Sequence, residues 1–156
     1  MLFWFVGMSV VGVVLVFQSA GVDHRLVIAG AVVPLVEGVI GHPWLLHTLL
    51  GAATVLGATI LSTRRHRLLR RRVLGLPIGL FAHLVLDAAW TRSRLFWWPF
   101  LGKSFGIEQV PELSRGLFGL VLEIAGLVAI GWCWRRFRLD VPENRRCFFT
   151  TGRLEA

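Results

Sequence analysis

The chain has 156 residues, of which 55% are hydrophobic and only 17% are charged, and its mean hydropathy is +0.67. This composition excludes a disordered chain and argues against a water-soluble globule, because one small soluble domain cannot bury so much apolar surface. Two cysteines, Cys133 and Cys147, are too few for a disulfide scaffold. We therefore expect an integral membrane protein.

Five apolar runs predict an all-α fold, a polytopic bundle of about five transmembrane helices. In chain order they cover residues 2–17, 26–41, 44–62, 73–90 and 117–134. The first run could instead be a cleaved signal peptide, but no basic segment precedes it. Pro34 interrupts the second run, and we expect it to break that helix and turn its end. The predicted domains are a transmembrane helical domain over 1–138 and a polar cytoplasmic tail over 139–156.

Two arginine clusters predict the orientation in a bacterial inner membrane. Residues 64–72 hold six arginines, and Arg135, Arg136 and Arg138 follow the fifth run. By the positive-inside rule both clusters stay in the cytoplasm, which places the N-terminus and the connection 91–116 outside. The formal charge of +8 is then a topology signal, so the expected partner is the lipid bilayer and not nucleic acid. Binding of anionic lipid or nucleic acid by the 64–72 cluster is the alternative.

Five ionisable side chains interrupt the apolar runs, namely Glu37, His47, His83, Asp87 and Glu123. Such groups are costly in a bilayer and persist where they pair, bind an ion or do chemistry. His83 and Asp87 are four residues apart, which puts an imidazole and a carboxylate on one helix face within reach of one metal ion. A structural hydrogen bond between them explains the same spacing. Glu123 could support His83 from a neighbouring helix or pair with an arginine.

Two further histidines, His42 and His47, lie at the expected outer end of the third helix, shortly after Glu37. In a five-span topology they share one membrane face with His83 and Asp87. Neutral imidazoles with a carboxylate suit a divalent ion, Zn²⁺ first, with an open position for water. The predicted metal ligands are His42, His47, His83 and Asp87. The predicted catalytic residues are Glu37, His83 and Asp87, with Glu37 acting as a ligand or as the general base.

Two other polar segments have plainer interpretations. Asp23 and His24 are typical of a polar turn ahead of a helix, and we expect them on the cytoplasmic side, far from Glu37. The aromatic segment 90–100 carries Arg92 and Arg94 and is typical of a segment lying at the membrane interface. In an enzyme, these arginines could hold the anionic head group of a substrate.

Four ordered blocks of the sequence carry a family resemblance. They are Gly-Ala-Val-Val-Pro-Leu-Val-Glu over 30–37, the histidines at 42 and 47, His-Leu-Val-Leu-Asp over 83–87 and Phe-Trp-Trp-Pro-Phe over 96–100. With these blocks the chain resembles the small inner-membrane proteins labelled metal-dependent hydrolases of unknown substrate. The resemblance implies that His42, His47, His83 and Asp87 match metal or catalytic positions, and that Glu37 replaces a family aspartate. The chain departs from the family pattern at Leu35, where the family has its first aspartate, and at Pro43 and Thr48.

Three hypotheses about function follow. The first is a membrane-embedded metal-dependent hydrolase acting on an amphiphilic ester or phosphoester. The second is a non-catalytic membrane scaffold or assembly protein, whose polar residues only pair helices. The third is an ion or proton conduit through the same groups. Whether the protein is an enzyme, and in which oligomeric state it works, is therefore left open by the sequence.

Overall fold

The computed structural model describes residues 1–18, 21–40, 45–100 and 116–154. Every regular element within these ranges is a helix, which confirms the all-α prediction. The elements are α1 (Leu2–Phe17), α2 (His24–Ile40), η1 (Leu45–His47), α3 (Leu49–Ser62), α4 (Arg67–Val73), α5 (Gly75–Leu86), η2 (Ala89–Thr91), α6 (Ser93–Phe96), α8 (Gly116–Arg136) and α9 (Pro142–Thr151).

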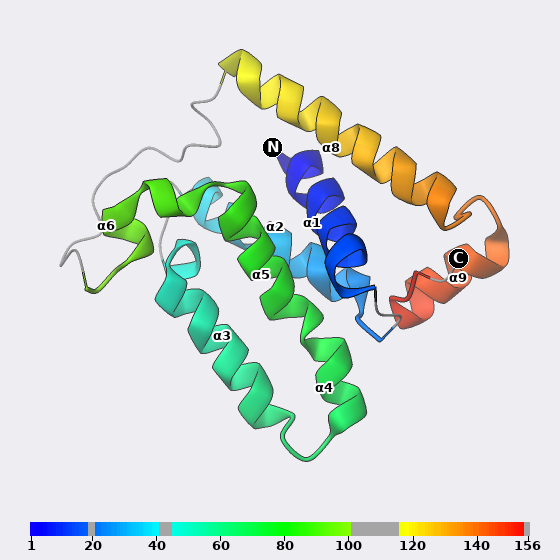
Figure 1. Ribbon diagram of the computed structural model, residues 1–156, viewed down its shortest axis with the longest axis horizontal. Helices are drawn as coiled ribbons and strands as arrows, with labels where there is room; N and C mark the ends of the chain where they lie inside the picture. Colours follow the sequence, from blue (N-terminus) through cyan, green and yellow to red (C-terminus); the bar gives the residue numbers. More distant parts are fainter. Residues whose placement is uncertain (19–20, 41–44, 101–115, 155–156) are drawn as a thin grey trace.

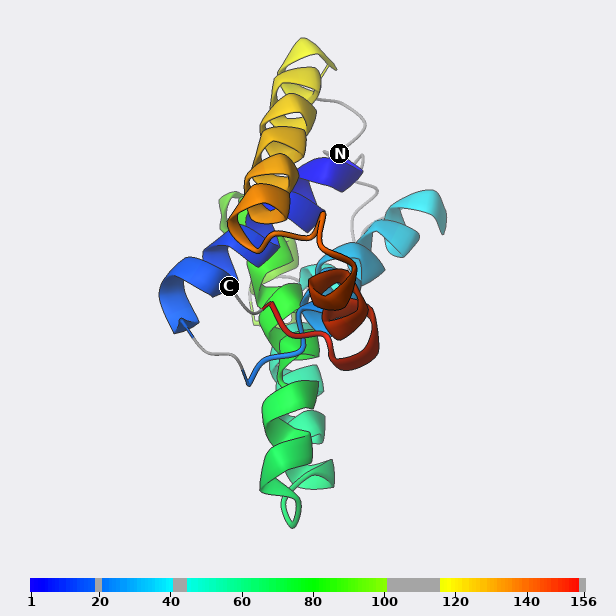
Figure 2. The same cartoon turned by 90° about the vertical axis from the view of Figure 1, so that its right-hand side faces the viewer.

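Helices α1, α2 and α5 form the centre of the molecule. Helix α2 packs along α5, and α1 contacts α2, α5 and α8. Helix α8 lies at one side and the hairpin of α3 and α4 at the opposite side, as both Figure 1 and Figure 2 show. The ends of α2 and α5 and the starts of α1 and α3 therefore meet around one region of the interior.

Glycines allow α2 and α5 to lie unusually close together. A Cβ atom at Gly79 of α5 would overlap the carbonyl oxygen of Val27, and one at Gly30 of α2 would overlap the carbonyl oxygen of Leu76. This backbone contact lets a side chain of α5 reach the main chain of α2 directly. The candidate functional site depends on this close approach of α2 and α5.

The prediction of about five membrane-spanning helices is not supported by the helix lengths. Among the described residues, one helix, α8, is both long and apolar enough to span, with 21 residues and a mean hydropathy of 2.0. Helices α1, α3 and α5 have 16, 14 and 12 residues, so at about 1.5 Å per residue they fall short of a hydrocarbon core of about 30 Å.

Local turns explain why the apolar runs do not become long helices. The 73–90 run is divided because α5 ends at Asp87, and Ala88 then adopts a left-handed conformation with φ of 52°. Pro34, in contrast, does not break α2, which continues through it to Ile40. The expectation of a break at Pro34 was wrong, because α2 tolerates the lost backbone donor in its interior.

The C-terminal segment packs against the helices. Leu154 is buried with Val10 of α1, Cys133 of α8 and Phe137, and Phe148 of α9 packs against this cluster. The segment predicted as a polar tail therefore contributes apolar side chains to the core of the helical domain.

Candidate metal centre

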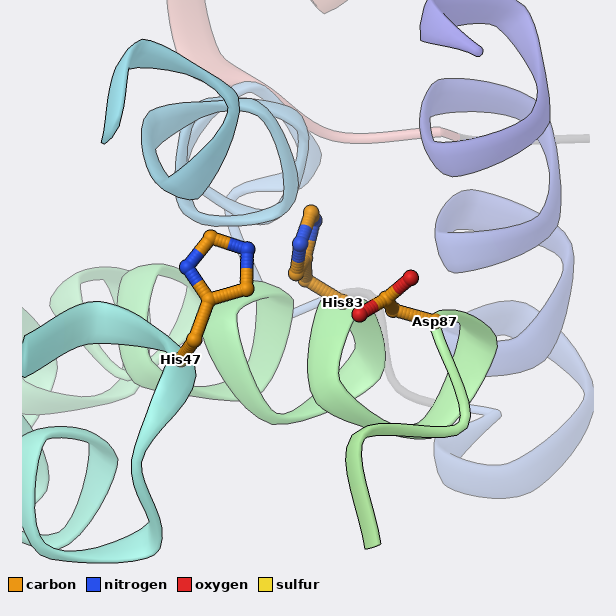
Figure 3. Close-up of side chains that lie close together, drawn as sticks. All are labelled: His47, His83 and Asp87. Atoms are coloured by element: carbon orange, nitrogen blue, oxygen red, sulfur yellow. The ribbon is translucent and has the colours of Figure 1, made fainter. Parts of the chain in front are cut away.

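Three chemically capable side chains meet in the interior, as Figure 3 shows. His47, His83 and Asp87 each offer one potential ligand atom, and these atoms all lie within 4.8 Å of one another. Both histidines are 0% exposed and Asp87 is 1% exposed. Because metal–ligand bonds of this kind are about 2.0 to 2.2 Å long, small shifts of these side chains would let all three contact one small cation.

Two neighbouring elements direct the three side chains inward. His83 lies on the last turn of α5, and Asp87 is the residue that caps its end, so the four-residue spacing places both on one face. His47 ends η1, directly before Thr48, the N-cap of α3. The Thr48 hydroxyl accepts a hydrogen bond from Gly51 N at 2.9 Å and donates one to Leu45 O at 2.7 Å, which fixes the junction that carries His47.

Each imidazole is oriented through its Nδ1 atom. His47 Nδ1 lies 2.8 Å from Glu37 Oε2, and His83 Nδ1 lies 2.7 Å from the Ala31 carbonyl oxygen. A carbonyl or carboxylate can accept the Nδ1 proton, and in the neutral form of such a ring the lone pair lies on Nε2. Metal-binding histidines are oriented in this way by a carboxylate or a carbonyl on the other ring nitrogen.

Glu37 uses both carboxylate oxygens to hold η1, the short helix that carries His47 and precedes α3. Oε2 binds the His47 ring, and Oε1 accepts a hydrogen bond from Leu46 N at 2.9 Å. Glu37 comes from α2, so its side chain ties α2 to η1. This arrangement favours an orienting role for Glu37 over the predicted roles of ligand or general base.

Aromatic contacts also restrict the His83 ring. Phe5 of α1 stacks on it with ring centroids 4.1 Å apart and an interplanar angle of 22°. The His47 ring meets it edge-on, at 5.3 Å and 84°. Contacts from α1, α2 and η1 therefore hold His83 in one orientation.

Asp87 is held by an arginine. Arg92 Nη2 donates a hydrogen bond to Asp87 Oδ2 and forms an ion pair with it. Arg92 directly follows η2, which returns the chain toward the end of α5. The ion pair offsets the cost of burying the Asp87 carboxylate.

The structure brings together most of the predicted site residues. His47, His83 and Asp87 form the cluster and Glu37 contacts His47, while the predicted ligand His42 lies outside the described residues. Glu123 takes neither predicted role, because it binds the Met1 amine at 2.9 Å and Trp4 N at 3.1 Å. It joins α8 to the start of α1.

Asp23 and His24 lie at the other end of α2. Three hydrogen bonds from Arg25 reach the Asp23 carboxylate, at 2.8 to 3.1 Å. His24 binds the Gly152 carbonyl oxygen through its backbone N at 2.8 Å and its Nδ1 at 3.2 Å. These residues fix the C-terminal segment to the start of α2.

Sequence reasoning missed two contributors to the centre, Ala31 and Phe5. The Ala31 contribution is a backbone carbonyl, which has no side-chain signature. Pro34 gave no signal for it either, since the N–H that proline lacks would have paired with the carbonyl of Gly30 and not with that of Ala31. Phe5 resembles every other apolar residue of its run and gave no signal.

A family comparison supplies the membrane assignment. A family model described as YdjM inner membrane protein matches residues 6–142. The chain belongs to this family. No match was found among curated proteins or among solved structures. Membership confirms the prediction of a small inner-membrane protein, and the apolar residues of α8 that face outward fit a lipid environment.

Proposed function

We propose that the protein is a membrane-embedded metal-dependent hydrolase whose centre is His47, His83 and Asp87. One observation carries the proposal: each of the three side chains is held by a partner. Glu37 holds His47, the Ala31 carbonyl holds His83 and Arg92 holds Asp87. Such outer partners are the usual support of metal ligands.

The residues present fit a divalent ion, with zinc as the first choice. Two neutral imidazoles and one carboxylate are a common catalytic zinc set, which leaves a fourth position open. When bound, the ion would act as a Lewis acid and lower the pKa of a water molecule toward neutrality. The centre does not depend on a carboxylate at Leu35, because Asp87 already supplies one.

The protein's own groups would support this chemistry in three ways. Glu37 and the Ala31 carbonyl fix the tautomers of the two imidazoles. Phe5 and the burial of the cluster keep bulk water away from the centre, which strengthens electrostatic interactions inside it. Arg92 balances the charge of Asp87.

The substrate class we propose is an amphiphilic ester or phosphoester. The segment that carries Arg92 also exposes Trp90, Trp97 and Phe100, which are 51%, 44% and 82% exposed. Exposed aromatic rings favour the boundary between lipid and water. A substrate with an apolar tail and a polar head would meet the centre at such a boundary.

We also propose that the chain crosses the membrane more than once. Besides α8, the apolar helices α1, α3 and α5 are candidates that would need local thinning of the bilayer, and α5 must cross between α4 and α8 if both arginine clusters lie on one side. The arginines of α4 and the end of α8 would then lie in the cytoplasm. Reporter fusions after residues 66, 100 and 154 test this, with cytoplasmic signals expected at 66 and 154 and a periplasmic signal at 100; a cytoplasmic signal at all three positions would contradict it.

A non-catalytic scaffold is the second candidate. The His83 contact joins α5 to α2, and the Glu37 contact joins α2 to η1. Hydrogen bonds of this kind associate helices in membranes without any ligand. A scaffold role predicts that these groups stabilise the protein and that metal does not bind.

Metal content and hydrolysis separate the two candidates. The protein is purified in detergent, reconstituted with zinc and compared with Asp87→Asn and Asp23→Asn. Asp23 is the matched control, because it is another buried aspartate paired with an arginine. We expect one zinc per chain and hydrolysis of chromogenic amphiphilic esters or phosphoesters in the wild type and in D23N, with both lost in D87N. Metal-free wild-type protein, or equal metal in all three, would contradict the proposal.

A further inference from the structure

The two terminal nitrogens of Arg92 have different surroundings. Nη2 binds Asp87, whereas Nη1 is buried and has no hydrogen-bond partner within the described part of the chain. A buried donor that stays unsatisfied is costly, and a charged one is more costly still. Nη1 is therefore suited to an acceptor that the chain itself does not supply.

Arg92 lies at the margin of the metal centre. The side chains of His47 and Asp87 are 0% exposed, whereas that of Arg92 is 18% exposed. The Arg92 side chain is therefore less buried than the cluster, and its segment also carries the surface formed by the exposed aromatic residues. A ligand approaching from that surface would meet Arg92 on its way to the cluster.

Charge balance favours an anionic ligand at this position. With a divalent cation in the proposed centre, the carboxylates of Asp87 and Glu37 would together balance the ion. The positive charge of Arg92 would then remain, in surroundings where an unbalanced charge is costly. A guanidinium group binds oxyanions through its N–H donors and is well matched to phosphate.

We propose that Arg92 forms an anion subsite that binds the phosphate group of the substrate next to the metal centre. This inference rests on the proposed function and narrows its substrate class to a phosphoester. Asp87 positions the guanidinium through Nη2, and Nη1 donates to a phosphate oxygen. The same chemistry would serve the phosphate of a lipid head group or that of a soluble phosphoester.

The subsite is tested by titrating inorganic phosphate into zinc-reconstituted protein in maltoside micelles, which contain no phosphate, using calorimetry. Arg92→Lys keeps the charge but replaces two terminal donor nitrogens in a rigid plane by one, so it cannot hold Asp87 and phosphate in the same geometry, and Arg94→Lys is the control at an exposed arginine of the same segment. We expect R92K to weaken phosphate binding about tenfold or more, with R94K within about twofold of the wild type. Zinc content is measured in all three and phosphate binding is compared per bound zinc, so that a change in metal loading is separated from a change in phosphate binding.

The outcomes distinguish this inference from the proposed function. Zinc-loaded wild type that binds no phosphate, or R92K that binds it as the wild type does, overturns the subsite and leaves the metal centre standing. Wild type without zinc overturns the metal centre, and titration of that metal-free protein still tests the subsite through the difference between R92K and R94K.

Competition identifies the source of the phosphate. A short-chain phosphatidic acid and glycerol phosphate are each used to displace inorganic phosphate from the zinc-loaded wild type. Stronger displacement by the acylated compound supports a lipid head group, and equal displacement supports a soluble phosphoester. Failure of both to displace phosphate overturns the assignment of the subsite to a substrate phosphoester.

Discussion

The two ends of α2 each carry a buried polar cluster, and they use similar residues differently. The C-terminal end contributes Glu37 to the cluster of His47, His83 and Asp87. The N-terminal end is preceded by Asp23 and begins with His24, which bind Arg25 and the Gly152 carbonyl. Both clusters contain histidine, a carboxylate and an arginine.

The two clusters differ in what their donor and acceptor atoms contact. At the start of α2, the Asp23 carboxylate is bound by Arg25 and the His24 ring by Gly152, so these groups hold the C-terminal segment in place. At the other end, outer partners hold the side chains and their potential ligand atoms converge within 4.8 Å. Burial of polar residues alone therefore does not distinguish the two clusters, and the convergence of potential ligand atoms is the observation on which the proposed metal centre rests.

The ionisation behaviour of the Asp23 cluster fits a structural role. Burial raises the pKa of the Asp23 carboxyl, but hydrogen bonds and charge from Arg25 outweigh this effect, so the pKa lies below its ordinary value. Burial lowers the pKa of His24, and the hydrogen bond to Gly152 offsets this only in part. The folded state therefore favours a charged Asp23 beside a neutral His24.

The largest expected effect comes from the α2–α5 contact that positions the proposed metal centre. Gly79→Ala places a Cβ against the Val27 carbonyl, and we expect a loss of about 3 kcal/mol or more in the free energy of unfolding, together with loss of zinc. Gly57→Ala is the control, because a Cβ there meets nothing within 4 Å, and it should be neutral or stabilising. Denaturant unfolding in micelles measures both, and a stable, zinc-binding G79A would contradict the described α2–α5 contact.

The next largest effect is expected at Glu37, the carboxylate that orients His47, and it is compared with Asp23 at the other end of α2. Glu37→Gln keeps the shape but removes the charge beside His47, so zinc affinity should fall about 10- to 100-fold. Asp23→Asn should leave zinc affinity unchanged, since Asp23 lies at the other end of α2. Competition with a chelator of known affinity measures both, and equal affinities for E37Q and the wild type would remove Glu37 from the centre.

A substitution at Gly152 tests the cluster at the N-terminal end of α2. Gly152 has φ of 73°, and a Cβ there would overlap the Asp23 carboxylate, so Gly152→Ala should cost about 1 to 2 kcal/mol locally. We expect faster hydrogen exchange over residues 148–154, with zinc affinity unchanged. Weaker zinc binding in G152A would show that the two ends of α2 are coupled and would contradict a purely structural role for the Asp23 cluster.

The smallest effect is a pH dependence of the C-terminal segment. Unfolded His24 takes up a proton below about pH 6.5, whereas folded His24 does so only at lower pH because its pKa is lowered. Between these values the unfolded state binds more protons, so stability falls as the pH falls. The protection of amides over residues 148–154, expressed relative to the intrinsic exchange rate at each pH, should therefore fall from pH 7.5 to 5.5, and His24→Asn, which keeps a donor but does not titrate, should reduce the change. An equal fall in protection in H24N would assign the pH dependence to another group.

The sequence predicted the helical class and part of the centre for clear physical reasons. Apolar runs indicate buried or lipid-facing helices whatever their partners, and the spacing of His83 and Asp87 places both on one helix face. Helix ends were less predictable, because the left-handed Ala88 and the continuous helix at Pro34 depend on tertiary contacts. The partner of Glu123 depends on how α8 packs against α1, which no local pattern encodes.

Zinc K-edge X-ray absorption of the zinc-loaded wild type tests the central claim most directly. The account predicts two imidazole nitrogens and carboxylate or water oxygen at about 2.0 to 2.2 Å, with no sulfur, and the loss of one imidazole in His47→Gln. A spectrum with oxygen ligands alone, with sulfur from Cys133 or Cys147, or unchanged by H47Q would contradict a metal centre at His47, His83 and Asp87.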